Sequence, residues 1–285
     1  MTSQKVAVVT GSSSGMGFET SLALARNGFY TYATMRKLEG EGTKQITDIA
    51  KNENLPLEII QLDVNNDKSV ADAIDRIVGE KDRIDVVVNN AGYGFTGALE
   101  ETSMDEIKSQ FETNFFGAVR VMKSVIPIMR KQATGIIVNT TSLSGKVPLP
   151  LESVYTASKF ALEGISESIQ YELEPLRIKI IIVEPGGVGS SFLKSSRAPK
   201  ASDLNSSYRS IENKISESFK QWSQNLMHPS EVAKVVLEAV TSDNPDLRYT
   251  VGKDASTMIE RRKNMSDREF HDMINKQFDL ENITS

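Results

Sequence analysis

Short, continuous runs of apolar residues alternate with longer segments of helical periodicity along this chain. Each run holds about 4 to 6 residues and does not alternate with polar ones, which is typical of strands buried on both faces of a parallel sheet. Strict alternation of such strands with helices predicts one doubly wound α/β domain with about seven strands. The expected strands are Val6–Val9, Phe29–Ala33, Leu57–Leu62, Ile84–Val88, Gly135–Val138, Ile178–Val183 and Tyr249–Val251.

Several of the segments between these runs have helical periodicity and residues typical of helix ends. Gly28 is a suitable C-cap for the first helix, and Pro175 follows the end of the fourth. Ser103 and Glu106 form a capping-box pattern that opens a long helix. The expected helices are 18–27, 67–79, 103–129, 154–173 and 230–240.

Two later regions depart from this alternation. Between Gly187 and His228 there is no strand pattern, but apolar residues recur at steps of 3 and 4 from Leu204 to Leu226, which predicts an amphipathic helix. Such a helix either packs on the body of the domain or covers a ligand. Residues 256–285 are polar, with a weak helical pattern, and are expected to form a peripheral helix and a frayed tail.

Composition excludes several classes of function. The chain has no cysteine and only two histidines, His228 and His271, so thiolate chemistry, disulfide scaffolds and histidine-based metal sites are not expected. The net charge of −5 and the absence of a long basic block argue against nucleic acid as a partner. No apolar run reaches the roughly 18 residues of a membrane span, and the N-terminal segment lacks the layout of a secretory signal. We therefore expect a soluble, cytoplasmic, metal-free protein.

A glycine-rich turn follows the first expected strand and precedes a helix. It reads Thr10-Gly-Ser-Ser-Ser-Gly-Met-Gly17. Glycines at 11, 15 and 17 allow positive φ angles and bring peptide N–H groups close to a ligand, and the following helix N-terminus favours anions. The turn therefore predicts a pyrophosphate site, the alternative being a tight turn without a ligand.

Together with motifs further along the chain, this turn resembles the short-chain dehydrogenase/reductase family over roughly residues 5–255. The later motifs are Asp63-Val64, Asn89-Asn90-Ala91-Gly92, Asn114, Ser142, Tyr155-x3-Lys159 and Pro185-Gly186. The resemblance implies a Rossmann-type fold, a nicotinamide dinucleotide cofactor, and cofactor contacts from these motifs. The implied contacts come from Gly11, Ser12, Ser14, Gly15, Met16, Gly17, Arg36, Asp63, Val64, Asn89, Ala91, Gly92, Tyr155, Lys159, Pro185, Gly186, Val188 and Ser190.

Hydride transfer to a carbonyl needs a proton donor and a group that holds the carbonyl oxygen. A lysine four residues after a tyrosine on a helix shares its face, and its ammonium lowers the pKa of the phenol. Tyr155 and Lys159 fit these roles, and Ser142 supplies a hydroxyl for the substrate oxygen. The resemblance implies that Asn114 completes the set through a water linked to Lys159.

A second Tyr-x3-Lys pair, Tyr249 and Lys253, lies on an expected strand, where a four-residue step does not bring side chains together. It also lacks a serine 13 residues upstream, where Val236 stands. We interpret Tyr249 as structural.

The end of the second expected strand indicates which nicotinamide cofactor is used. An acidic residue there selects NAD, whereas an arginine accepts the 2′-phosphate of NADP. This chain has Met35 and then Arg36 and Lys37, which favours NADP(H). Two observations keep the alternative open: Arg36 and Lys37 could form only a solvated turn, and Ser14 stands where many NADP-preferring relatives carry a basic residue.

We therefore expect an NADP(H)-dependent oxidoreductase acting on a carbonyl or secondary alcohol of a mostly apolar small molecule, with residues 1–255 as one domain and 187–228 as a substrate lid. The tyrosine-arginine segment after the second strand and the Asn-Asn-Ala-Gly motif resemble the hydroxysteroid and retinol dehydrogenase-like branch. Alternatives are an NAD-linked alcohol dehydrogenase and a catalytically silent dinucleotide-binding sensor or scaffold. The resemblance also implies a homodimer or homotetramer.

Overall fold

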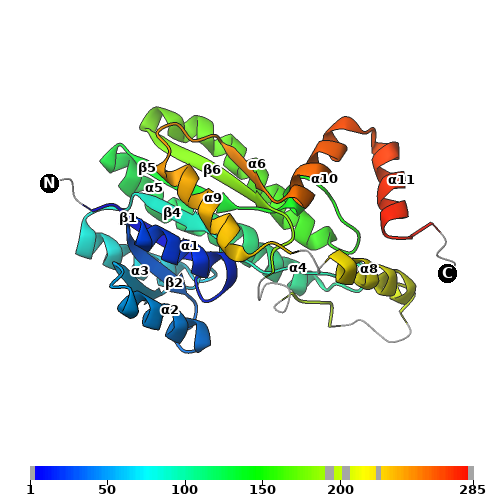
Figure 1. Ribbon diagram of the computed structural model, residues 1–285, viewed down its shortest axis with the longest axis horizontal. Helices are drawn as coiled ribbons and strands as arrows, with labels where there is room; N and C mark the ends of the chain where they lie inside the picture. Colours follow the sequence, from blue (N-terminus) through cyan, green and yellow to red (C-terminus); the bar gives the residue numbers. More distant parts are fainter. Residues whose placement is uncertain (1–3, 190–195, 201–205, 223–225, 282–285) are drawn as a thin grey trace.

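A seven-stranded parallel sheet forms the centre of the protein in a computed structural model that describes residues 4–189, 196–200, 206–222 and 226–281 (Figure 1). The strand order is β3-β2-β1-β4-β5-β6-β7, and every pair of neighbours is parallel. The strands are β1 (Val6–Thr10), β2 (Tyr30–Met35), β3 (Leu57–Gln61), β4 (Val86–Asn89), β5 (Gly135–Thr140), β6 (Ile178–Pro185) and β7 (Arg248–Val251). The Rossmann-type α/β fold predicted from the sequence is confirmed.

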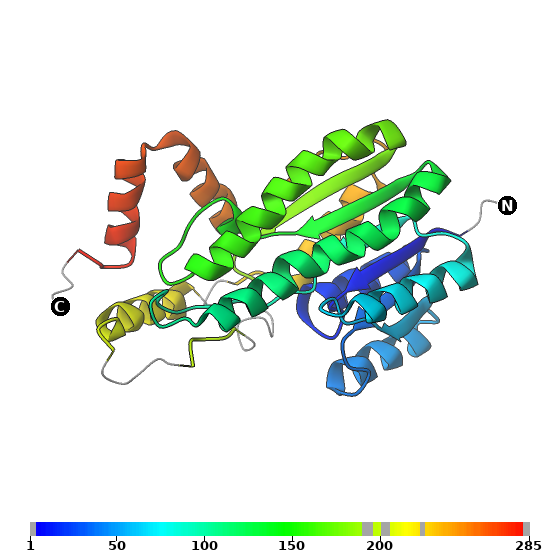
Figure 2. The same cartoon turned by 180° about the vertical axis from the view of Figure 1, so that it is seen from behind.

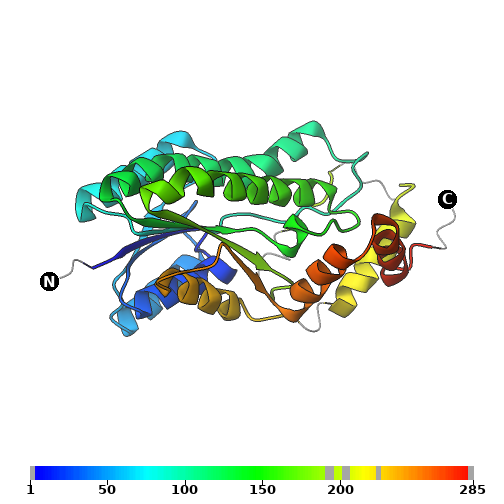
Figure 3. The same cartoon turned by 90° about the horizontal axis from the view of Figure 1, so that it is seen from above.

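Two layers of helices enclose the sheet, as the view from above shows (Figure 3). Side chains of α3, α5 and α6 pack on one face, and those of α1, α2 and α9 pack on the other. The view from behind shows α5 and α6 along the first of these faces (Figure 2). The bounds are α1 (Gly15–Arg26), α2 (Glu41–Asn52), α3 (Asp67–Lys81), α5 (Gly117–Gln132), α6 (Ser153–Leu173) and α9 (Pro229–Thr241).

The long helix predicted from Ser103 begins as predicted but is not uniform. Ser103 caps α4 (Met104–Phe111) in a capping box with Glu106. A π-helical turn, Glu112–Phe116, then connects α4 to α5 without a break in direction. Such wide turns insert one extra residue into a helix and are frequent at functional sites. The turn contains Asn114, one of the predicted site residues.

The structure differs from the sequence expectations in the C-terminal third. The amphipathic helix is α8, Arg209–Trp222, and Leu204 lies outside the described residues. Residues after β7 form two helices, α10 (Lys253–Asn264) and α11 (Asp267–Gln277), so the boundary expected at residue 255 falls inside α10. Apolar side chains of these two helices are buried together with Ile215 of α8. In Figure 1 these three helices lie together beyond the carboxyl ends of the strands.

The strand order reverses direction between β1 and β4, because β2 follows on one side of β1 and β4 pairs with the other. In open parallel sheets, ligands bind outside the carboxyl ends of the strands at such a switch point. The glycine turn after β1 and the Asn-Asn-Ala-Gly segment after β4 meet there. None of the helices in the described ranges combines the length and the apolar character that a membrane span requires.

Candidate active site

The glycines of the turn after β1 are required by its geometry. Gly11 and Gly15 have φ angles of +71° and +60°, a region that side chains with a Cβ disfavour. A Cβ on Gly17 would lie 2.5 Å from the carbonyl oxygen of Gly11 and 2.4 Å from Nδ2 of Asn90. The close approach of this turn to the segment after β4 therefore depends on glycine.

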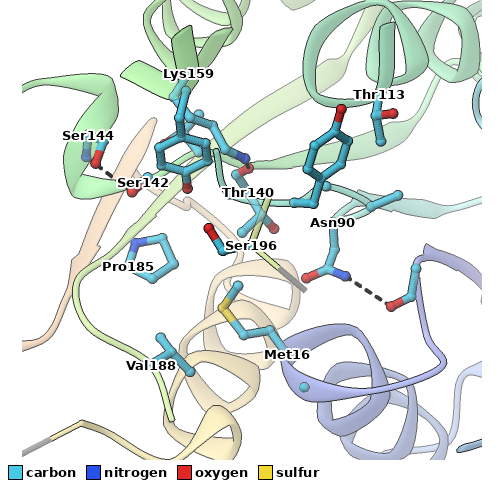
Figure 4. Close-up of a pocket in the computed structure, with 18 of the residues that line it drawn as sticks. Met16, Asn90, Thr113, Thr140, Ser142, Ser144, Lys159, Pro185, Val188 and Ser196 are labelled. Atoms are coloured by element: carbon cyan, nitrogen blue, oxygen red, sulfur yellow. Dashed lines mark hydrogen bonds between the residues drawn. The ribbon is translucent and has the colours of Figure 1, made fainter. Parts of the chain in front are cut away.

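Thr10 fastens this turn to the segment after β4. Its hydroxyl oxygen accepts hydrogen bonds of 3.0 Å from the N–H groups of Asn90 and Ala91, and it donates to the carbonyl of Val88. The amide Nδ2 of Asn90 donates back to the carbonyl of Thr10 at 2.9 Å. Two loops from different strands thus form one rigid wall, and Figure 4 shows Asn90 on this wall with Met16 nearby.

A cavity of about 740 Å³ opens between this wall and the ends of β5 and β6. Its size suits a dinucleotide together with part of a small substrate. Most of the predicted site residues line it: Gly11, Ser14, Gly15, Met16, Arg36, Asp63, Val64, Ala91, Gly92, Ser142, Tyr155, Lys159, Pro185, Gly186 and Val188. The structure therefore brings together residues that lie up to 177 positions apart in the sequence, from Gly11 to Val188.

Four predicted site residues lie behind the cavity wall instead. The hydroxyl of Ser12 donates to the carbonyl of Val9, and Gly17 packs against Gly11. The side chain of Asn89 is buried in the sheet, where its Nδ2 donates to Oδ1 of Asn139 at 2.8 Å, and the following Asn90 lines the cavity in its place. The fourth of these residues, Asn114, is buried behind the loop after β4. Ser190 lies outside the described residues.

Tyr155, Ser142 and Lys159 meet at the carboxyl end of β5. Ser142 follows β5 directly, and the phenol of Tyr155, in the first turn of α6, is hydrogen-bonded to the Ser142 side chain. One turn further along α6, Nζ of Lys159 lies 5.8 Å from the centre of the Tyr155 ring and donates a 2.9 Å hydrogen bond to the carbonyl of Thr140. Figure 4 shows Ser142, Lys159 and Thr140 on the side of the cavity opposite Met16.

Burial dominates the proton affinities at this end of the cavity. It raises the pKa of Tyr155, an effect that the hydrogen bond with Ser142 opposes and the nearby Glu152 reinforces. Burial also lowers the pKa of Lys159 to about 8, against the attraction of Glu163. The sequence argument expected the lysine to lower the pKa of the phenol. Desolvation is the larger effect in the structure, so Tyr155 is a neutral phenol at pH 7.

Asn114 supports the site from behind through its amide. Nδ2 donates to the carbonyl of Tyr93 at 3.0 Å, and Oδ1 accepts from the N–H of Tyr93 at 3.1 Å. A Cβ on Gly92 would lie 3.1 Å from Asn114 Oδ1 and 3.8 Å from Lys159 Nζ. Because glycine has no Cβ, the space between the Asn114 amide and the Lys159 ammonium stays open. The π-helical turn aims this amide at the loop after β4.

Arg36 and Asp63 lie at the other end of the cavity, after β2 and β3. Arg36 is exposed and forms no salt bridge with any residue in the described part of the chain. Gly42, in the first turn of α2, packs so closely on the glycine turn that a Cβ there would overlap the carbonyl of Ser13. This contact holds the segment that carries Arg36 against the phosphate loop.

Sequence reasoning missed several residues that line the cavity. Asn90 belongs to the Asn-Asn-Ala-Gly motif and lines the cavity, whereas the side chain of Asn89 points into the sheet. Glu152 belongs to no motif, and no signal in the sequence places it here, whereas Arg197 and Phe219 lie within the expected lid, 187–228. Across the described ranges, no group of three or more acidic or histidine side chains is placed to hold a metal ion.

Fold and site together define an oxidoreductase of the Rossmann type. Residues 5–201 match the family described as short chain dehydrogenase. A 3-ketodihydrosphingosine reductase from Bacteroides thetaiotaomicron is 33% identical over 260 residues, which cover 91% of this chain and 92% of that protein. The human 17-beta-hydroxysteroid dehydrogenase type 1 is 35% identical over 255 residues, 86% of this chain and 76% of that protein.

Solved structures agree with these relatives. A short-chain dehydrogenase from Streptomyces avermitilis superposes with a TM-score of 0.81 at 28% identity, covering 98% of this chain and 100% of that one. ElxO with NADP bound gives a TM-score of 0.74 at 27% identity, covering 89% and 99%. The chain belongs to the short-chain dehydrogenase family, in the branch that resembles hydroxysteroid and retinol dehydrogenases.

Proposed function

We propose that this protein is an NADP(H)-dependent reductase that interconverts a carbonyl and a secondary alcohol on a mostly apolar small molecule. The observation that carries the proposal is the buried pair of Tyr155 and Ser142, with Lys159 one turn away, in the same cavity as the glycine turn. Proton donor, oxygen-binding hydroxyl and anion site thus share one enclosed space, which hydride chemistry requires.

The chain's own residues supply the proton and the orientation. A reduced nicotinamide, when bound, supplies the hydride to the carbonyl carbon. Ser142 donates a hydrogen bond to the carbonyl oxygen, and Tyr155 transfers its phenolic proton to that oxygen as negative charge develops. Because burial raises the pKa of Tyr155, the phenol is in the protonated form that reduction needs. Lys159 then stabilises the phenolate by its charge, and Asn114 supports the site through a water linked to Lys159.

The cavity wall fits a dinucleotide cofactor. Positive φ angles at Gly11 and Gly15 and the tight contact at Gly17 leave the start of α1 open to a pyrophosphate. The exposed guanidinium of Arg36 at the same wall is suited to bidentate binding of a 2′-phosphate. ElxO, a relative in fold, has NADP bound. Asp63, Val64 and the Pro185-Gly186 segment are assigned to the remaining cofactor contacts.

Apolar side chains at the other end of the cavity suit an apolar substrate. The walls there include Leu143, Leu149, Phe219 and Leu226. We assign segment 187–228 as the substrate lid, with α8 as its described helix. Only part of the apolar stripe of α8 is available for this, because Ile215 is buried against α10 and α11, whereas Phe219 lines the cavity.

Two alternatives are tested by the same measurements. An NAD-linked alcohol dehydrogenase would use the same residues with the opposite cofactor preference. A silent sensor or scaffold would bind dinucleotide without turnover, and the presence of the tyrosine, the lysine and the serine in contact distance disfavours it.

A screen of hydrophobic ketones and aldehydes with NADPH, followed by its absorbance, tests the proposal. We expect ketone-dependent oxidation of NADPH that is at least about tenfold more efficient in kcat/KM than with NADH. Cofactor binding without turnover of any ketone would favour a sensor, and a preference for NADH would favour the NAD-linked alternative.

We also propose that the protein forms a homodimer or homotetramer through α5 and α6. Phe116, at the start of α5, and Phe160, on α6, are 47% and 43% exposed, although large aromatic side chains are usually buried. Analytical ultracentrifugation of Phe160→Glu should give a smaller assembly than the wild type. An unchanged assembly would rule out this face as the subunit contact.

A further inference from the structure

An acidic side chain that the proposed chemistry does not use lies beside the reacting hydroxyls. Glu152 immediately precedes α6, three residues before Tyr155, and it lines the cavity. Its Oε2 accepts a 2.9 Å hydrogen bond from the hydroxyl of Ser144. The N–H of Ser144 in turn donates to Oγ of Ser142 at 3.1 Å, a bond drawn in Figure 4. Ser144 therefore connects the carboxyl group of Glu152 to Ser142, the serine proposed to bind the substrate oxygen.

The side chain of Glu152 makes few contacts that stabilise the fold. Although it occupies the N-cap of α6, its side chain accepts no capping hydrogen bond from that helix. It also forms no salt bridge with any described residue. Its one hydrogen bond, from Ser144, needs only a neutral oxygen, which a glutamine would supply equally well.

The surroundings of Glu152 disfavour an uncompensated negative charge. Burial raises its pKa to about 7, and the hydrogen bond from Ser144 only partly opposes this. Leu143 and Leu149 line the same part of the cavity. A carboxylate among apolar side chains is costly without a positive partner, and a cation brought next to it would be bound firmly.

Two of the cations that line the cavity are engaged elsewhere. Lys159 donates to the carbonyl of Thr140, and the guanidinium of Arg197 lies 4.1 Å from the centre of the Tyr93 ring. Besides Glu152, the titratable side chains that line the cavity are Arg36, Asp63, Tyr93, Tyr155, Lys159, Arg197 and Lys220. None of these forms a salt bridge with Glu152 in the described structure, so a cationic group of a ligand would meet a carboxyl group that no described cation neutralises.

We propose that Glu152 binds a cationic amino group of the substrate, so that the preferred substrates are apolar carbonyl compounds with an ammonium group on a carbon close to the carbonyl. This inference rests on the proposed function and narrows its substrate class. The connection through Ser144 places the cation beside the carbonyl, and the apolar walls take the remaining hydrocarbon. A neutral ketone or steroid-like alcohol would leave Glu152 without a partner.

Ligand binding tests this without turnover. Calorimetric titration of the NADP-saturated protein with n-octylammonium and with n-octanol at pH 8, above the pKa of Glu152 of about 7, compares a cation with a neutral molecule of the same length. We expect the wild type to bind the ammonium at least about tenfold more tightly than the alcohol, as a charge-assisted contact implies. Glu152→Gln, which retains an acceptor for Ser144, should remove that preference.

Glu260→Gln, an exposed position on α10, is the matched control and should leave both affinities unchanged. Equal affinity of the wild type for the two ligands would overturn the proposal. A preference that persists in Glu152→Gln would overturn it as well, because another residue would then hold the cation.

Steady-state kinetics separates the role of Glu152 from the proposed function. Two alkyl ketones are compared, one with an ammonium next to the carbonyl and one with a methyl group in its place. We expect Glu152→Gln to lower kcat/KM for the first at least about tenfold more than for the second, mainly through KM. An equal loss in kcat for both would make Glu152 a positioning residue for the Ser142 loop and contradict the proposal. If neither ketone is reduced, the proposed function fails, while the titration still decides whether Glu152 binds cations.

Discussion

Nζ of Lys159 donates a 2.9 Å hydrogen bond to the carbonyl oxygen of Thr140, which joins the second turn of α6 to the last residue of β5. The lysine is only 5% exposed, and this burial lowers its pKa to about 8. The contact therefore holds the ammonium beside Tyr155, and burial makes the charge of Lys159 sensitive to pH in a mildly alkaline range.

This pKa predicts a pH-dependent stability. The pKa of Lys159 is lower in the folded protein than in the unfolded chain, so between pH 8 and pH 10 the unfolded chain binds more protons and folding gains stability as pH rises. The gain from this group should be about 1 kcal/mol between pH 8 and pH 9. Urea unfolding of the wild type and Lys159→Met across this range measures it, as the difference in slope. Parallel pH profiles of the two proteins would show that the lysine does not titrate there.

Cofactor preference is predicted to depend on Arg36. Its guanidinium lies at the cavity wall without a salt bridge to the described residues, so a 2′-phosphate would be its partner. Arg36→Ala should lower kcat/KM for NADPH by about tenfold to a hundredfold and change that for NADH little. Lys51→Ala is the control, because Lys51 on α2 is exposed and does not line the cavity. Equal use of both cofactors by the wild type would contradict the assignment.

A buried ion network behind the site is predicted to be essential for stability. Arg248 on β7 donates to Glu184, which is fully buried on β6, and to Glu163 and Glu167 on α6. Removing its charge leaves the buried carboxylate of Glu184 without a positive partner in the described structure, whereas Glu163 and Glu167 keep Lys146. Arg248→Met should therefore cost about 3–5 kcal/mol in the free energy of unfolding, measured by urea denaturation.

Arg76 provides the matched comparison on the surface. It contacts Glu58 and Glu80, and all three side chains are partly or largely exposed. Arg76→Met should cost no more than about 1 kcal/mol. Similar losses for Arg248→Met and Arg76→Met would show that burial does not strengthen the network.

The lid assignment predicts ligand-dependent proteolysis of α8. Trypsin can cleave at Lys214 and Lys220, and the helix is held mainly by contacts such as that between the rings of Phe219 and Phe278, 5.9 Å apart. Cofactor plus substrate at about ten times their dissociation constants should slow cleavage about tenfold, if cleavage requires the open form. Cofactor alone serves as the control. Cleavage at the same rate with and without substrate would remove the lid from the proposal.

The strands and the glycine turn could be predicted from sequence because each rests on local physics. Buried parallel strands need continuous apolar runs, and a tight turn beside an anion needs glycine. Helix α2 is not among the expected helices: its apolar side is narrow, with Ile46 and Ala50 buried and Ile49 partly buried. The sequence predicts one peripheral helix after β7, where the structure has two, α10 and α11. Their apolar side chains are buried together with those of α8 and not against the sheet.

The site was harder to predict than the fold wherever side-chain direction decides. The Asn-Asn-Ala-Gly motif identifies the loop after β4 but not the direction of its side chains. Asn89 points into the sheet toward Asn139, and Asn90 lines the cavity. Glu152 carries no motif at all, and its place beside Ser142 comes from the short turn at Ser144. Such neighbours are set by tertiary packing and cannot be read from spacing.

Tyr155→Phe is the variant that tests the central claim most directly. It removes one hydroxyl, the proposed proton donor, and should lower kcat by at least roughly 10²–10⁴ while NADPH binding, followed by fluorescence, changes little. Lys159→Ala should weaken both turnover and cofactor binding. Tyr249→Phe is the matched control. The Tyr249 hydroxyl accepts a 2.9 Å hydrogen bond from the N–H of Asp246, just before β7, so its loss should cost at most about 1 kcal/mol of stability and leave the rate intact.

The decisive measurement is kcat for ketone reduction at saturating NADPH in these two tyrosine variants. We expect a folded, cofactor-binding Tyr155→Phe with almost no turnover, beside a fully active Tyr249→Phe. An active Tyr155→Phe would contradict the assignment of the proton donor, and with it the proposed mechanism.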